Sequence, residues 1–264
     1  MSTKHDLKYS ILSILKHNKD GSFATQSNRR DQLLKLAEDL LGKGFCLKNI
    51  HQLKAKHIYQ MIEAWKSDGL SAGTIKNRLS NIRWLCEKIN KPGLIPTRND
   101  ALNIEKRQYV TNQDKSINLD ENKLDKISDA NIKISLQLQK AFGLRKEESI
   151  KIKIHEAVIG DTLVLRGSWC KNGRSRTLAI RTTEQREVIK ACKQFVGEMN
   201  RALIPNGKSY YQQMKKYENE LAKAGIGKAH GLRHAYAQQR YKELTGWECP
   251  VKGGPTKNQP PPNN

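Results

Sequence analysis

Length, composition and charge restrict the class of protein. The chain has 264 residues, of which 37% are hydrophobic and 28% charged, which suits one large domain or two ordinary ones. No stretch approaches the ~18 consecutive apolar residues of a membrane span, and the first 16 residues lack the apolar block of a signal peptide. Five scattered cysteines without a Cys-x-x-Cys pair argue against a disulfide framework or a zinc ribbon. We therefore expect a cytoplasmic protein with no membrane partner.

The net charge of +22 is the most informative bulk property. Residues 1–110 hold 20 Lys and Arg against 10 Asp and Glu, and the remainder holds 28 against 16, so the excess is spread over the chain. Such an excess favours a polyanionic partner, because neutralising phosphates releases condensed counterions. A merely soluble basic protein and a lipid-binding protein are the alternatives, but we find no basic amphipathic helix with a bulky aromatic face. Nucleic acid is the expected partner.

The first hundred residues show apolar side chains at helical spacing. Helices are predicted over residues 28–41 after a possible cap at Ser27, over 54–66, and from Ser71 to about Ile89. The third helix carries basic residues off its apolar stripe, namely Lys76, Arg78, Arg83 and Lys88. They form either an ordinary solvated face or a DNA-binding surface, and Lys76, Arg78 and Arg83 are the candidate DNA contacts.

The second half of the chain mixes helices with short strands. A helix is predicted from Leu119 to about Phe142, followed by strands over 150–154, 162–165 and 176–180, then further helices. These patterns predict a helical domain over residues 1–95, a linker over 96–118, a second domain over 119–249 and a disordered tail over 250–264. The expected fold class is mainly α, with an α+β second domain that is mostly helical and carries a small β-sheet or hairpin.

Three short segments hold candidate chemistry. Residues 141–148 place Arg145 after an apolar helix and a glycine, with Glu148 three residues on, which alone could be a surface ion pair. Residues 167–176 place Lys171 at the tip of a predicted hairpin, with Arg174 and Arg176 beside it as candidate DNA contacts. Lysines at hairpin tips usually have no specific function, but in a chain of this charge Lys171 could reach a DNA groove or phosphate.

The third segment covers residues 230–237 and contains two histidines and an arginine. His230 and Arg233 are three residues apart, which places them on one face of a helix. His230 and His234 have a spacing that can bind zinc, but no third ligand lies near them in the sequence. We therefore expect no metal there.

Together and in this order, the three segments resemble the tyrosine recombinase or phage integrase family. The family has an arginine in a Gly-Leu-Arg-x-x-Glu turn, a lysine on a β-hairpin and a His-x-Leu-Arg-His box, then a second His or Trp and the nucleophilic Tyr. Residues 68–80 also resemble the family's helical core-binding domain, so the resemblance spans residues 28 to 249. It implies site-specific recombination or integration of double-stranded DNA, with the two domains on opposite sides of the duplex.

The resemblance also implies roles for individual residues. Arg145 and Arg233 would bind the non-bridging oxygens of the phosphate at the transition state, and His230 would donate a hydrogen bond or move a proton. Lys171 would act as general acid towards the leaving 5′-oxygen. A tyrosine would attack the phosphate and form a phosphotyrosine. The resemblance implies no metal and no nucleotide cofactor.

The sequence departs from the family pattern after the third segment. The 31 residues that follow Arg233 contain the tyrosines Tyr236 and Tyr241, both on the helix of the box itself, and Trp247 near the predicted tail. We therefore assign no nucleophile, and expect a truncated integrase or a fragment of a longer protein. A third explanation, less favoured, is that Tyr241 has taken over as the nucleophile. The alternative function is a non-enzymatic DNA-binding remnant that competes with an intact integrase. Members of the family form tetramers on DNA and often exchange a C-terminal segment between subunits. We expect this sequence to lack that segment, and therefore expect any homo-oligomer on DNA to be weakened. A basic RNA-binding protein is a third possibility, which leaves the ordered set of residues unexplained.

Overall fold

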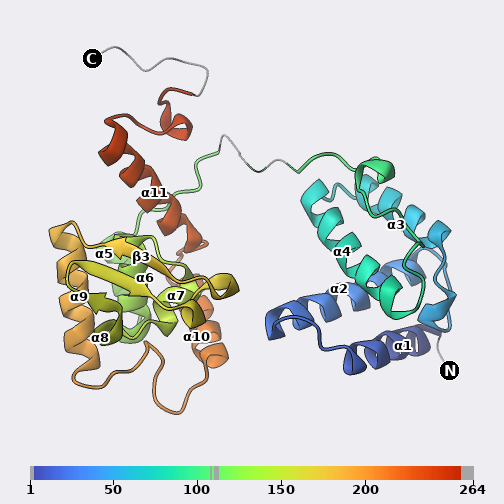
Figure 1. Ribbon diagram of the computed structural model, residues 1–264, viewed down its shortest axis with the longest axis horizontal. Coiled ribbons are helices and arrows are strands. Elements are labelled where there is room, and N and C mark those ends of the chain that lie inside the picture. The colour runs from blue at the N-terminus through green and yellow to red at the C-terminus, as the bar shows by residue number, and fades with distance from the viewer. Residues whose placement is uncertain (1–2, 108, 110–112, 257–264) are drawn as a thin grey trace. The chain divides into compact units, whose positions relative to one another are not determined.

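The computed structural model describes residues 3–107, 109 and 113–256 of the chain. It divides into two compact units, residues 1–111 and 112–264, each with its own buried core (Figure 1). The first unit is helical, and the second is mostly helical with one small sheet. This composition confirms the expected fold class.

In the described part of the first unit there are four α-helices and two short 3-10 helices. They are α1 (Thr3–His17), α2 (Phe23–Gly42), η1 (Ile50–Gln52), α3 (Ala55–Ser67), α4 (Ala72–Lys88) and η2 (Asp100–Leu102). The structure bears out the predictions for α3 and α4, and Ser71 caps α4 by accepting a hydrogen bond from the Thr74 N–H. The predicted start of α2 at Asn28 is wrong. The helix begins five residues earlier, because Ser22 and not Ser27 supplies the cap.

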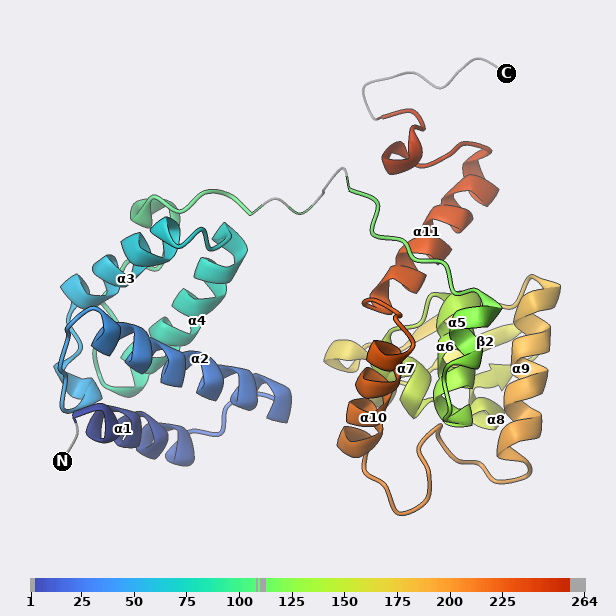
Figure 2. The same cartoon turned by 180° about the vertical axis from the view of Figure 1, so that it is seen from behind.

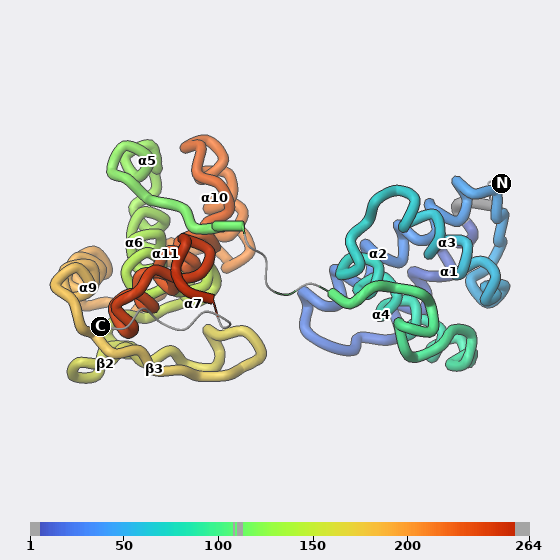
Figure 3. Tube along the Cα trace, turned by 90° about the horizontal axis from the view of Figure 1, so that it is seen from above, coloured from blue at the N-terminus to red at the C-terminus, as the bar shows by residue number. Residues whose placement is uncertain are grey.

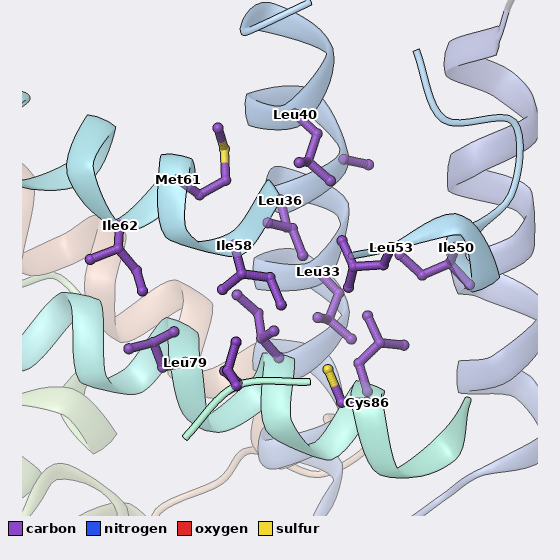
Figure 4. Packing of buried hydrophobic residues seen from close by; sticks show 14 of the residues in the cluster. Leu33, Leu36, Leu40, Ile50, Leu53, Ile58, Met61, Ile62, Leu79 and Cys86 are labelled. Atoms are coloured by element: carbon purple, nitrogen blue, oxygen red, sulfur yellow. The ribbon is translucent and has the colours of Figure 1, made fainter. Parts of the chain in front are cut away.

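Apolar stripes of these helices form one core (Figure 4). Leu33, Leu36 and Leu40 of α2 lie against Ile58 and Met61 of α3 and against α4. Each of these side chains is almost completely buried, which is worth about 1.5–3 kcal/mol apiece relative to an exposed side chain. The apolar residues whose 3.6-residue spacing identifies each helix are therefore also the residues that form the core.

The segment predicted as a linker over residues 96–118 is attached to both units. Leu102 and Ile104 are buried in the core of the first unit. Farther on, the Ile117 N–H donates to the Gly231 carbonyl, and the Asp114 carboxylate accepts from Gln238, both within the second unit. Because this segment is mostly polar, the burial of its few apolar residues was not predicted from the sequence.

The second unit has seven helices and three strands among its described residues, with three 3-10 turns. The elements are α5 (Glu121–Asp125), α6 (Ala130–Phe142), α7 (Lys146–Lys151), α8 (Ile154–Ala157), β1 (Val158–Ile159), β2 (Thr162–Leu165), η3 (Gly167–Trp169), η4 (Lys171–Gly173), β3 (Arg176–Ala179), α9 (Thr183–Val196), α10 (Tyr210–Lys223), α11 (His230–Thr245) and η5 (Pro250–Lys252). The strands form an antiparallel sheet in the order β1-β2-β3, with Leu163 opposite Leu178.

Two predicted elements of this unit are wrong. The single helix expected from Leu119 to Phe142 is split, because the Asp129 side chain accepts hydrogen bonds from two backbone N–H groups and starts α6 as a separate helix. Where a strand is predicted over 150–154, the end of α7 and the start of α8 are joined by Ile152 and Lys153, and Lys153 alone forms an isolated β-bridge, with Ala202. Alternate isoleucines there are all buried, which imitates the period of a strand.

Helix α6 lies in the middle of the second unit, with α9 on one side and α10 on the other (Figures 2 and 3). Its residues enter two cores: Leu138 and Phe142 pack with the sheet and α9, whereas Ile132 and Leu136 pack with α10. The C-terminal half of α11 extends beyond the rest of this unit (Figures 1 and 2), in keeping with buried residues only at its start.

The predicted tail over 250–264 begins with an ordered turn. Cys249 is buried, and η5 follows it directly. Residues 257–264 lie outside the described part of the chain. Among the described residues, no helix has the length and apolar character needed to cross a membrane.

Candidate active site

The turn between α6 and α7 positions Arg145. Gly143 ends α6 in the left-handed region at φ +59°, which a glycine adopts without steric cost. Leu144 is buried, and Arg145 immediately precedes the first residue of α7. The turn is therefore fixed by backbone conformation and by packing, and it leaves the Arg145 side chain 40% exposed.

Glu148 is a fully buried carboxylate beneath this turn. It accepts hydrogen bonds from the Arg145 N–H at 2.7 Å, from Nη1 of Arg145 at 2.7 Å and from Nη2 of Arg176 at 2.6 Å. Burial raises the pKa of Glu148, but the Arg145 hydrogen bonds and the charge of Arg176 outweigh it and hold the pKa below its ordinary value. The interpretation of Arg145 and Glu148 as a surface ion pair is wrong, because Glu148 is inside the protein.

Arg176 belongs to this group, although the sequence indicated only a possible DNA contact. It is the first residue of β3, and its side chain is 25% exposed. Along β3 the side chains of Arg176 and Leu178 face inwards, while their neighbours are exposed. The two-residue period of the predicted strand could have identified Arg176 as inward-facing, since Ile180 continues the same face.

Arg233 reaches the same turn from α11. Its Nη1 donates a hydrogen bond to the Gly143 carbonyl. Burial lowers the pKa of Arg233, and the nearby charges of Arg176 and Arg145 lower it further. Two guanidinium groups, of Arg145 and Arg176, thus bind one buried carboxylate. The third, of Arg233, binds the adjacent turn, which leaves an excess of positive charge suited to an anion.

His230 lies one turn before Arg233 at the start of α11. Burial lowers the pKa of His230, and the charges of His234, Arg233 and Arg145 add to this effect. The His230 and His234 rings meet edge to face, with their centroids 5.1 Å apart. His230 is therefore near the arginines, and its lowered pKa favours the neutral imidazole. Among the described residues, no group of three or more His, Cys, Asp or Glu is placed to hold a metal ion.

Lys171 lies in the connection between β2 and β3, within η4. Trp169 and Cys170 are buried and anchor this connection, while Lys171 and Arg174 are exposed. The connection closes tightly, because a Cβ on Gly167 would lie 2.3 Å from the Gly173 carbonyl oxygen. Within the part of the chain that the structure describes, no hydrogen bond or ion pair joins Lys171 to the arginine group.

The basic residues of α4 are partly engaged within the first unit. Arg78 forms an ion pair with Asp39 at 3.0 Å and lies over the Trp65 ring at 4.8 Å. Arg83 donates to the Pro96 carbonyl at 2.9 Å. These two guanidiniums stabilise the fold, and Lys76 is half-buried on the same helix.

Two family models match the sequence. The phage integrase N-terminal domain matches residues 5–92, and the integrase domain matches residues 108–239, which is half of the chain. Comparison with functionally curated proteins finds no significant match.

Several solved structures share the fold. A lambda integrase dimer bound to a COC′ core site has a TM-score of 0.57 at 14% identity, covering 88% of this chain and 70% of that one. The XerH site-specific recombinase bound to difH substrate has a TM-score of 0.52 at 16% identity, covering 89% and 74%. The Tn1549 transposon integrase in complex with circular intermediate DNA has a TM-score of 0.51 at 12% identity, covering 93% and 88%. Because the integrase domain model matches half of this chain, the chain belongs to the integrase family of tyrosine recombinases.

Proposed function

We propose that this chain binds double-stranded DNA as a site-specific recombination protein, and that Arg145, Arg233, His230 and Lys171 act on the phosphate at the site of strand exchange. The observation that carries the proposal is the binding of Arg145 and Arg176 to the buried Glu148, with Arg233 on the adjacent Gly143 carbonyl and His230 beside them. A buried carboxylate with three guanidiniums retains a net positive charge. That charge is suited to a phosphate monoanion.

The arrangement suits phosphoryl transfer. Negative charge builds up on the non-bridging oxygens at the transition state, and Arg145 and Arg233 offer paired N–H donors for these oxygens. The lowered pKa of His230 favours the neutral imidazole, which can donate one hydrogen bond or accept a proton. Lys171 acts as general acid towards the leaving 5′-oxygen, which requires its connection to approach the phosphate when DNA is bound.

The charge distribution supports duplex DNA as the partner. The chain has a net charge of +22, and both halves are basic. We assign phosphate contacts outside the active site to the exposed Arg174 and to Lys76. Arg78 and Arg83 contribute charge, but their guanidiniums are held by internal contacts. We further propose that the chain forms a homo-oligomer on DNA, as the lambda integrase does in its tetramer bound to a Holliday junction. The proposed place of action is the cytoplasm.

Duplex binding and covalent chemistry test the proposal separately. The probe for binding is a library of random-sequence duplexes, titrated by fluorescence anisotropy at several salt concentrations. Affinity should fall by about 10³–10⁵ between about 50 and 200 mM salt if six to ten phosphates are contacted. Tighter binding of structured RNA than of duplex at matched salt would overturn the assignment.

Covalent chemistry is measured on sequences selected from that library. Arg145→Ala and Arg233→Ala should retain much of the duplex binding, with a loss of about tenfold in affinity for one charge-assisted hydrogen bond, and should abolish any protein–DNA adduct seen on a denaturing gel. Normal adduct formation by either variant would show that the arginines are wrongly assigned. Glu147→Ala, at a half-exposed neighbour on α7, is the matched control.

A non-enzymatic DNA-binding protein is the second candidate function. It is favoured by the engagement of Tyr236, a tyrosine on α11. The Tyr236 hydroxyl accepts a hydrogen bond from Arg181 at 3.2 Å and so already has a partner within the protein. In this case the chain would occupy a site and compete with an intact recombinase. Duplex binding without any covalent adduct is the expected result, and detection of an adduct would exclude it.

A further inference from the structure

Tyr236 and Arg233 contact the same turn from one face of α11. They are three residues apart, which places them one above the other along the helix. Arg233 donates to the Gly143 carbonyl, and the Tyr236 ring lies against the Cα of the same glycine. A Cβ on Gly143 would be 2.5 Å from Cδ1 and 2.9 Å from Cγ of Tyr236. Real side chains essentially never approach so closely, so the ring occupies the space that any other residue would need.

The turn beneath the Tyr236 ring determines where Arg145 points. Gly143 has φ +59°, and Arg145 follows two residues later as the residue before α7. A shift of Gly143 would move the carbonyl that accepts from Arg233 and the backbone that carries Arg145. Both proposed phosphate ligands therefore depend on the position of this one glycine.

The Tyr236 hydroxyl is bonded to a different part of the unit. It accepts from Nη2 of Arg181 at 3.2 Å, and Arg181 also pairs with Glu243 of α11 at 3.7 Å. Arg181 lies just before α9, on the side of the cavity lined by Thr182, Gln185 and Glu243. The hydroxyl thus bonds to the start of α9, while the ring contacts the α6–α7 turn.

We propose that Tyr236 is a positioning residue and not the nucleophile, and that its ring fixes the Gly143 turn and thereby the relative placement of Arg145 and Arg233. This inference rests on the proposed function of the two arginines. The ring acts by occupying volume, so the hydroxyl is dispensable. The side chain is fixed between the turn and Arg181, and its role is steric.

Three substitutions at one position separate the ring from the hydroxyl. Tyr236→Phe keeps the ring, Tyr236→Leu keeps apolar bulk without a flat ring, and Tyr236→Ala removes both. Tyr241→Ala, on the same helix, is the matched control, and thermal melts identify any variant that fails to fold. The main readout is the pKa of His230 from NMR titration, because Arg145 and Arg233 help to lower that pKa. A purely structural loss of stability would not change it.

The Phe variant and the Tyr241→Ala control should match the wild type in His230 pKa and in affinity for a random-sequence duplex library. The Leu and Ala variants should raise the His230 pKa and weaken duplex binding about tenfold, the effect of one charge-assisted hydrogen bond. If folded Leu and Ala variants keep both values, the ring does not position the arginines. If the wild type forms a covalent DNA adduct that Tyr236→Phe loses, Tyr236 is the nucleophile. Failure of the proposed function differs from both outcomes, since the wild type and Arg233→Ala would then bind DNA equally.

Discussion

Replacing Glu148 by Gln should destabilise the second unit strongly. The substitution keeps the shape of the side chain but removes the one carboxylate that Arg145 and Arg176 share. Removing one partner of a buried ion pair costs about 3–5 kcal/mol, because the remaining charge is left unpaired. The two guanidiniums are 40% and 25% exposed and can turn towards water, so we expect the lower end, about 3 kcal/mol. That is a large fraction of the ~5–15 kcal/mol that stabilises a typical domain.

Urea denaturation measures this free energy, with the transition of the second unit followed separately because the chain has two units. Glu147→Gln is the matched control: it makes the same chemical change on the same helix, at an ion pair with Lys151 whose carboxylate side chain is 43% exposed. Such exposed pairs are worth about 0–1 kcal/mol. Equal losses for Glu148→Gln and Glu147→Gln would refute the view that Glu148 organises the site.

The pH dependence gives an independent check of the same carboxylate. The folded-state pKa of Glu148 lies below its ordinary value, so its contribution is present above the unfolded pKa of about 4.3 and is lost as pH falls through the folded pKa. The difference in unfolding free energy between the wild type and Glu148→Gln should therefore be constant near neutrality and shrink in acid below about pH 4. A difference that grows in acid would contradict the assignment.

Three further predictions follow from close approaches and from His230. Gly231→Ala should cost about 1–3 kcal/mol in urea denaturation, because its Cβ would lie 2.7 Å from the Lys115 carbonyl oxygen; an unchanged midpoint would contradict this. Gly167→Ala should open the connection that carries Lys171, since its Cβ would lie 2.3 Å from a carbonyl oxygen; faster amide exchange of Cys170 is the expected sign, and unchanged exchange would argue against it. The folded pKa of His230 is lowered, so its stabilising contribution is present above the unfolded pKa of about 6.5 and lost below it. Thermal melts at several pH values should therefore show a shallower loss of stability below that pH for His230→Gln than for the wild type. Equal slopes of melting temperature against pH for the two proteins would contradict this.

Local patterns in the sequence were sufficient for two helices of the first unit, although they missed α1 and the start of α2. The apolar spacing of α3 and α4 and the Ser71 cap are local properties, so periodicity and capping chemistry predicted both helices closely. The order of Arg145, Lys171 and the His230–Arg233 box likewise identified the family without any knowledge of contacts. Residue type and order determine these features, and folding does not alter them.

The tertiary structure alone decided the environment of the candidate site. A carboxylate three residues after an arginine is the same sequence whether it lies on the surface or in a core. Glu148 is buried only because α7 packs against α6, α10 and η3, and the Arg176 side chain then reaches it from β3. The strand predicted over 150–154 failed for a similar reason, since burial of alternate isoleucines in two short helices imitates a strand. The place of Tyr236 against Gly143 depends on α11 meeting the end of α6, a contact between residues far apart in the chain. A sequence read locally specifies periodicity and chemistry, whereas burial and shared partners arise only when distant segments pack together.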